Sequence, residues 1–99
     1  MSIFVGSWNA DLTTPIGKIV AVFNFVETDG VLGGTASTDA ETVDILEAAA
    51  DGNHLTWIQH VTTPMKLTLK FDVTVDGDVM TGSYKAGLLP TSTIHATRA

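Results

Sequence analysis

The chain contains one sequence pattern twice, once in each half. Each copy begins with a tryptophan, continues through a Thr-Thr-Pro triplet and an alternating stretch, and ends near a glycine. The matched positions are Trp8 with Trp57, residues 13–15 with 62–64, Phe23 with Phe71, and Gly34 with Gly82. A unit repeated in this way typically cannot bury its own apolar face and packs against its copy. The sequence therefore predicts a single domain over residues 1–99, with an internal repeat at 1–50 and 51–99.

Alternation of apolar and polar residues dominates both copies, and helical periodicity is poor. Strands are expected near residues 3–12, 17–27, 31–38, 42–50, 54–62, 65–75, 79–86 and 91–98. Asp-Gly turns at 28–30, 51–53 and 76–78 join alternate pairs of strands. Consecutive antiparallel strands without a helix to cover their edges favour closure. The prediction is an all-β, eight-stranded antiparallel up-and-down barrel, built from two four-stranded repeats. An open sandwich of the same strands is the alternative.

Alternation also predicts which face of each strand is buried. From Leu67 to Val75 every second residue is aliphatic or aromatic, so this set is expected inside the barrel. In the strand over 42–50, matching Leu46 with Ile94 in the repeat places Asp44 inside as well. The opposite choice for that strand would bury Val43, Ile45 and Glu47 instead.

Gly6 and Trp8 form a G-x-W motif on the first expected strand, and Arg98 lies on the last one. This combination resembles the calycin superfamily, the eight-stranded barrels of lipocalin and avidin type. The resemblance implies that Arg98 packs across Trp8 at the closed end of the barrel, because a guanidinium stacks well on an indole ring. It also implies a ligand class, one small and mostly apolar molecule held inside the barrel. The helix that follows the barrel in lipocalins is missing, and no avidin biotin site transfers to this chain.

Polar residues are expected to gather inside one end of the barrel, where the longer connections lie. They stand at positions where the two copies differ: Gln59 matches Ala10, Tyr84 matches Ala36, and Asp44 matches Ser92. A few converging polar groups in an apolar site are typical of a small-molecule pocket. The residues expected to bind the ligand are Gln59, Ser92, Trp57, Met65, Leu12, Leu67 and Leu88.

The same residues leave an alternative open, a cofactor-free isomerase, cyclase or lyase. Asp44 would then act as the general base, and Tyr84 would donate a hydrogen bond to the developing negative charge. A second alternative is a structural or interaction barrel whose core is filled by its own side chains. Val5, Val20 and Val22 are expected on the outer face of adjacent strands, which fits a homodimer.

The charge balance limits the partners of the chain. Eleven acidic residues against five basic ones give a formal net charge of −6, which disfavours nucleic acid and anionic membranes as partners. No apolar stretch is long enough to span a bilayer, and the N-terminus lacks a secretory signal pattern. Together with the absence of cysteine, this favours a cytoplasmic location. The histidines, at 54, 60 and 95, have no metal-binding spacing, so neither a metal nor a cofactor is expected.

Overall fold

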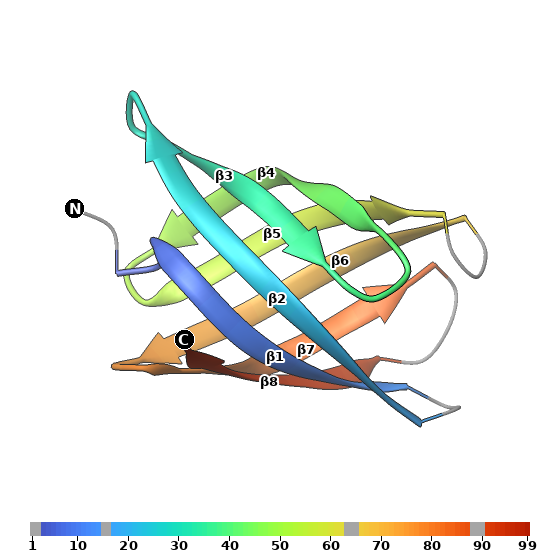
Figure 1. The fold of residues 1–99 in the computed structure, drawn as a ribbon. Coiled ribbons are helices and arrows are strands. Elements are labelled where there is room, and N and C mark those ends of the chain that lie inside the picture. Colours follow the sequence, from blue (N-terminus) through green and yellow to red (C-terminus); the bar gives the residue numbers. More distant parts are fainter. Residues whose placement is uncertain (1–2, 15–16, 63–65, 88–90) are drawn as a thin grey trace.

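A computed structural model describes residues 3–14, 17–62, 66–87 and 91–99, and this part of the chain consists of strands without helices (Figure 1). The strands are β1 (Gly6–Thr14), β2 (Gly17–Thr28), β3 (Val31–Ser37), β4 (Thr42–Asp51), β5 (His54–Val61), β6 (Leu67–Asp76), β7 (Val79–Ala86) and β8 (Ser92–Arg98). Each pairs antiparallel with the next, and β8 pairs with β1, so the sheet closes. The predicted all-β, eight-stranded antiparallel barrel is confirmed, and the open sandwich is wrong, since closure removes the unpaired edges.

The connections divide the barrel into two ends. At the first end, which we call the floor, two-residue turns join β2 to β3, β4 to β5 and β6 to β7. Asp29 and Gly30 both have positive φ, 51° and 79°, as the twist of a type I′ hairpin requires. The other end, which we call the rim, carries the connections that follow β1, β3, β5 and β7. Residues 3–5 and the C-terminus lie near the floor (Figure 1).

A β-bulge interrupts the pairing of β4 with β5. Leu46 pairs with Ile58, but the next pair joins Ala49 to Thr56, so two residues of β4 oppose one residue of β5. Glu47, at the bulge, has a φ of 51°. A bulge of this kind shifts the side-chain alternation of its strand by one position.

The bulge explains why the face predicted for the first half of β4 was wrong. Ile45 is buried and Val43 is half-buried, whereas Asp44 is exposed on the outer wall. Beyond the bulge Ala48 packs against the core, as expected. The repeat match of Leu46 with Ile94 therefore does not extend to the orientation of Asp44.

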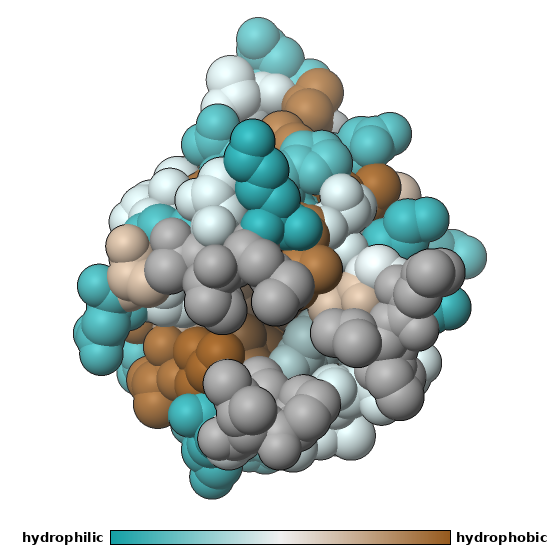
Figure 2. Space-filling view, turned by 90° about the vertical axis from the view of Figure 1, so that its right-hand side faces the viewer, coloured by the Kyte–Doolittle hydropathy of each residue, from teal (hydrophilic) through white to brown (hydrophobic). Residues whose placement is uncertain are grey.

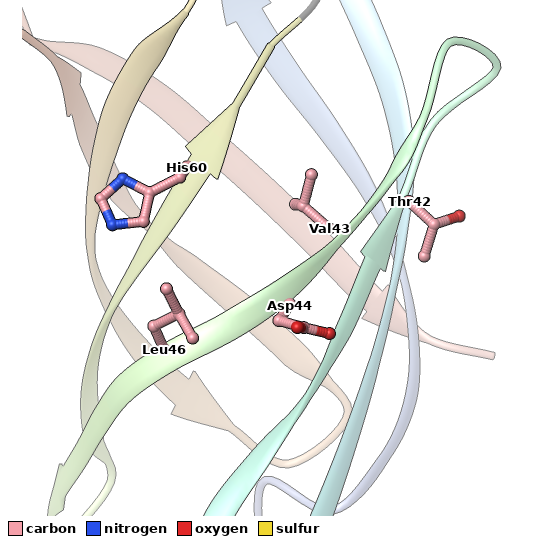
Figure 3. Close-up of a pocket in the computed structure, with 5 residues that line it drawn as sticks. All are labelled: Thr42, Val43, Asp44, Leu46 and His60. Carbon is pink, nitrogen blue, oxygen red and sulfur yellow. The ribbon is translucent and has the colours of Figure 1, made fainter.

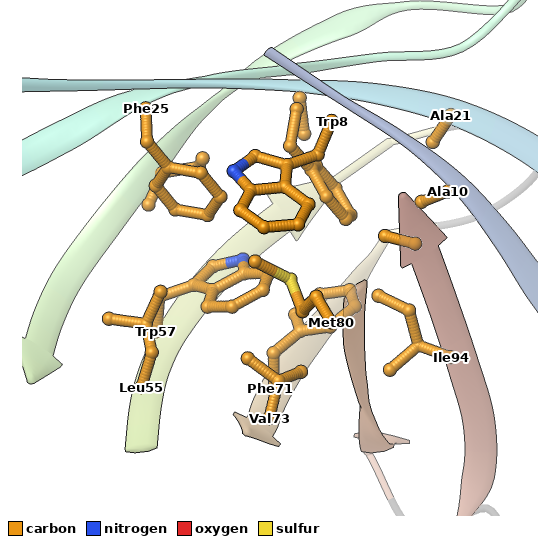
Figure 4. Packing of buried hydrophobic residues seen from close by; sticks show 14 of the residues in the cluster. Trp8, Ala10, Ala21, Phe25, Leu55, Trp57, Phe71, Val73, Met80 and Ile94 are labelled. Atoms are coloured by element: carbon orange, nitrogen blue, oxygen red, sulfur yellow. The ribbon is translucent and has the colours of Figure 1, made fainter. Parts of the chain in front are cut away.

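Aromatic rings and alanines fill the barrel between the floor and the rim. The largest fully buried side chains are Trp8, Trp57, Phe4, Phe23, Phe25, Phe71, Leu55, Met80 and Val73. Ala10 pairs with both Ala21 and Ala96, so a small-residue wall on β1, β2 and β8 leaves space for rings from the other strands. Figure 4 shows Trp8 and Trp57 pointing into one shared core, with Met80 beside them. Small barrels are typically filled in this way.

Arg98 closes the floor. Its guanidinium lies 4.3 Å from the ring centroid of Trp8, which confirms the stacking that the calycin resemblance implied. The same group donates to the carbonyl oxygens of Val5 at 2.9 Å and Ile3 at 2.8 Å, and its Nε lies 3.0 Å from a carboxylate oxygen of Asp78. One side chain thus fixes the segment before β1, the first strand and the β6–β7 turn.

Two glycines allow the wall to bend where its strands approach closely. A Cβ at Gly82 would lie 2.1 Å from the carbonyl oxygen of Asp72, and one at Gly34 would lie 1.8 Å from that of Asn24. Gly33, the neighbour of Gly34, has no atom within 4 Å of such a position. Any larger residue at Gly82 or Gly34 must therefore displace the backbone of the adjacent strand.

Candidate functional site

Inward-facing aliphatic residues at the rim form what we call the mouth of the barrel. They are Leu12, Ile19, Val43, Leu67 and Leu69. Ile19 is 39% exposed, whereas Ala21 and Phe23, the next inward residues of β2, are 2% and 0% exposed. Figure 2 looks onto this end, and apolar side chains gather there beside polar ones. The interior is therefore packed in depth but presents apolar surface to solvent at the rim.

Stacked aromatic rings lie beneath the mouth. Trp57 and Phe71 are parallel, with centroids 4.7 Å apart and planes at 6°. Phe71 and Tyr84 continue the stack at 5.2 Å and 22°. The register of β5, β6 and β7 creates this row, because Trp57 pairs with Phe71 and Phe71 with Tyr84. The result is a buried apolar layer at the base of the mouth, in which the ring faces are turned toward one another.

Tyr84 brings the one phenolic hydroxyl of the chain to this layer. The hydroxyl donates to the carbonyl oxygen of Thr13 at 2.7 Å, which links β7 to β1 across β8. Burial raises the pKa of Tyr84 above its usual value of 10.0, and a hydrogen bond with Ser92 acts in the opposite direction. Tyr84 is therefore a neutral hydrogen-bond donor at physiological pH.

The structure brings together only some of the polar residues singled out in the sequence. Tyr84 and Ser92 are cross-strand partners at the base of the mouth. Gln59 faces inward and is 4% exposed, but its Oε1 accepts a 2.7 Å hydrogen bond from Nε1 of Trp57. Asp44 lies on the outer wall, so the arrangement predicted for an enzyme, with Asp44 and Tyr84 in one cavity, is wrong.

The apolar residues predicted to contact a ligand have different positions. Leu12 is buried at the mouth, Leu67 is half-buried there, and Trp57 belongs to the ring layer below. Met65 and Leu88 fall outside the described residues. Every buried side-chain nitrogen or oxygen in the described ranges has a hydrogen-bond partner. The polar groups inside the barrel are thus already engaged in its own structure.

Asp44 instead lines a shallow hollow of about 250 Å³ where β4 and β5 separate towards the rim (Figure 3). The lining residues are Thr42, Val43, Asp44, Leu46 and His60. On the rim side of the pair of Leu46 with Ile58, no ladder pairing joins the described residues of these two strands. A second hollow of about 240 Å³ continues across β5 and β6. These hollows lie outside the packed core.

Glu41 holds the two strands together where their ladder is missing. Its carboxylate accepts from the backbone N–H of Thr62 at 3.1 Å and from the Thr62 hydroxyl at 3.2 Å. Sequence reasoning missed this contact, since it joins two connections that are distant in the sequence. The Thr-Thr-Pro triplet in which Thr62 lies was the available signal, because it marked the β5–β6 connection as a distinct feature.

The histidines lie on the outer wall, separate from one another. His54 is bonded to Asp72, and Nδ1 of His60 is 3.1 Å from the hydroxyl of Thr68. Within the described ranges, His, Asp and Glu residues do not converge in a group of three that could hold a metal ion.

The comparisons with known proteins do not assign the chain to a family. No family model matches the sequence, and no curated protein matches it significantly.

No helix in the described part of the chain is long and apolar enough to cross a membrane.

Proposed function

We propose that the protein binds a small, mostly apolar molecule at the mouth of the barrel. The observation that carries this proposal is the partial exposure of inward-facing aliphatic residues, with Ile19 at 39% and Leu67 and Leu69 half-buried. Concave apolar surface that stays accessible is the usual basis of small-molecule binding. A ligand seated there removes this surface from water, which gains about 25 cal/mol for each Å² buried.

The shape of the site favours a compact ligand. The stacked rings of Trp57, Phe71 and Tyr84 are buried directly below the mouth and leave the ligand little depth. The Ser92 hydroxyl, half-buried beside Tyr84 and hydrogen-bonded to it, still has lone pairs that can accept a hydrogen bond from a polar group of the ligand. The filled core beneath excludes a long chain that would run down the barrel axis.

The proposal includes a calycin-like class and a cytoplasmic location. The G-x-W motif, the closed barrel and the stacking of Arg98 on Trp8 support the calycin-like class. The absence of cysteine from the sequence fits a reducing compartment.

Titration with anilinonaphthalene, an uncharged fluorescent probe, tests the proposal. Ile19→Glu places a charge in the mouth and should weaken probe binding at least roughly tenfold, since an apolar ligand does not compensate the desolvation of a carboxylate. Val20→Glu is the matched control, because Val20 is the next residue of β2 and is 63% exposed on the outer wall. Equal loss in both variants, or no binding by the unmodified protein, would refute the proposal.

A second candidate function is that of an interaction barrel with a filled core. The burial of the aromatic residues favours it, together with the outward apolar surface of Val20 and the half-buried Val22 on β2. The register pairs these two residues with Asp11 and Asn9, so the Val5 expected beside them does not belong to this surface. This surface would form a homodimer. Sedimentation of the unmodified protein and of Val20→Glu tests the dimer: a dimer that becomes monomeric supports this candidate, and a monomer in both cases removes it.

A further inference from the structure

All four lysines of the chain lie in the rim half of the barrel, although the protein as a whole is acidic. Lys18 is the second residue of β2, Lys66 directly precedes β6, Lys70 lies on β6, and Lys85 is the next-to-last residue of β7. Lys70 and Lys85 are direct cross-strand partners. We call Lys66, Lys70 and Lys85, which share the outer wall of β6 and β7, the lysine cluster.

The lysine cluster has no carboxylate counterion among the described residues. The ion pairs there join His54 to Asp72 and Arg98 to Asp78. Asp72 shares the outer face of β6 with Lys70, but it is held by His54. Two like charges directly opposite each other destabilise a sheet, so Lys70 and Lys85 oppose the folding of the barrel unless an anion lies between them.

The cluster is adjacent to the mouth through the alternation of β6. Leu67 and Leu69 point into the mouth, while Lys70 lies on the outer face of β6 and Lys66 is exposed directly before the strand begins. Lys85 is exposed one residue before the rim end of β7. Lysine stems are long and flexible and carry their ammonium groups well beyond the backbone. An anionic group at the edge of the mouth is thus within reach of the cluster.

We propose that the ligand of the mouth is an anionic amphiphile, with its apolar body on Leu67 and Leu69 and its acidic group on the lysine cluster. This inference rests on the proposed function and specifies its ligand class. The acidic group is a carboxylate, sulfonate or phosphate, which share the negative oxygens that ammonium groups bind. Lys66, Lys70 and Lys85 then supply selectivity for the anion in a protein whose net charge of −6 otherwise repels it.

A matched pair of fluorescent probes tests this inference. Anilinonaphthalene sulfonate and uncharged anilinonaphthalene share one apolar body and differ in the sulfonate group. The unmodified protein should bind the sulfonate more tightly, and this preference should fall as salt rises, because salt screens exposed charges. The double variant Lys70→Gln with Lys85→Gln should weaken binding of the sulfonate roughly fivefold to tenfold, as expected for the loss of two exposed ion pairs. Binding of the uncharged probe should stay the same.

Lys18→Gln is the control, since it removes one positive charge from the rim on β2 and not on β6 or β7. It should change binding of the sulfonate less than Lys85→Gln does. If neither probe binds, the proposed function itself fails. If the uncharged probe binds and the sulfonate shows no advantage, or if Lys18→Gln and Lys85→Gln have equal effects, the lysine cluster is not an anion site and only this inference is overturned.

Discussion

The floor and the rim of the barrel use their basic residues in opposite ways. At the floor, Arg98 is bonded to Asp78 and to two backbone carbonyls, and it stacks on Trp8. At the rim, Lys70 and Lys85 face each other without a carboxylate partner in the described part of the chain. A charge that satisfies local groups contributes to folding, whereas like charges placed together oppose it. The floor is thus arranged for stability, and these two lysines of the rim support the proposal that this end contacts an anionic ligand.

The apolar residues show the same contrast. Phe4, Trp8 and Met80 are at most 2% exposed, whereas Ile19 at the rim is 39% exposed although its side chain faces inward. The side chains between the mouth and the floor are closely packed, so an added or removed atom there cannot be accommodated without cost. Changes in the lower barrel should therefore lower stability, and changes at the rim should alter binding with little effect on stability.

The largest expected effect comes from Gly82→Ala, which tests whether the barrel wall below the mouth can accommodate an added methyl group. The added methyl group would lie 2.1 Å from the carbonyl oxygen of Asp72 and 2.7 Å from the Cα of Val73. Forcing these backbone atoms apart should cost at least about 3 kcal/mol or prevent folding. Gly33→Ala is the control, with no atom within 4 Å, and should change the free energy of unfolding by about 1 kcal/mol or less. Urea denaturation measures both, and equal losses would contradict the close approach.

Arg98→Ala should lower the free energy of unfolding by about 2 to 3 kcal/mol, because it removes the stacking on Trp8, two charge-assisted hydrogen bonds to backbone carbonyls and the exposed ion pair with Asp78. Arg98→Lys should recover only part of this loss, since an ammonium cannot donate in the forked geometry that reaches Ile3 and Val5. Lys85→Ala provides the comparison with the rim and should not destabilise the protein. A loss of stability in Lys85→Ala as large as that in Arg98→Ala would remove the distinction between the two ends.

Tyr84→Phe should have a smaller effect, because it removes one hydroxyl and keeps the ring stack. Loss of the 2.7 Å bond to the carbonyl oxygen of Thr13 should lower the free energy of unfolding by about 1 kcal/mol. Thermal denaturation measures this difference. A loss of several kcal/mol would mean that the ring itself had moved, and the near-ultraviolet circular dichroism of the aromatic core would then change too.

The alkaline titration of the same residue gives an independent check. Burial raises the pKa of Tyr84 above 10.0 in the folded state, so its contribution to stability is fully present below pH 10 and is lost as pH rises through the folded-state pKa. Absorbance at the tyrosinate band should therefore appear at higher pH in the folded protein than in urea. Since Tyr84 is the only tyrosine, the signal needs no assignment. An identical midpoint in both conditions would contradict its burial.

Much of the fold could be predicted because local signals agreed with one another. The alternation from Leu67 to Val75 and the Asp-Gly turns determined the strand order, and Gly6, Trp8 and Arg98 indicated the closed end. The register also followed from the sequence in principle. A two-residue turn at 77–78 necessarily places Lys70 opposite Lys85, so the lysine pair was predictable although its significance was missed.

The site was less predictable because it depends on exceptions to alternation. Ile45 and Leu46 are adjacent aliphatic residues, so either face of β4 was compatible with the pattern, and only the bulge at Glu47 decides between them. The bond from Thr62 to Glu41 depends on how two connections meet in space. Burial of Gln59 was correctly predicted, but its engagement by Trp57 required the side-chain conformations.

The smallest expected effect, Lys85→Glu, separates stability from binding at the rim. Replacing one member of a like-charged cross-strand pair by an opposite charge should raise the free energy of unfolding by about 0.5 kcal/mol. The gain should disappear at high salt, because both side chains are exposed. The same variant should bind anilinonaphthalene sulfonate more weakly than the unmodified protein, since a carboxylate now stands where the anion would bind. If the lysine cluster is an anion site that destabilises the fold, the variant should be more stable and bind the sulfonate less tightly. A loss of both stability and binding would mean instead that Lys85 has a structural role.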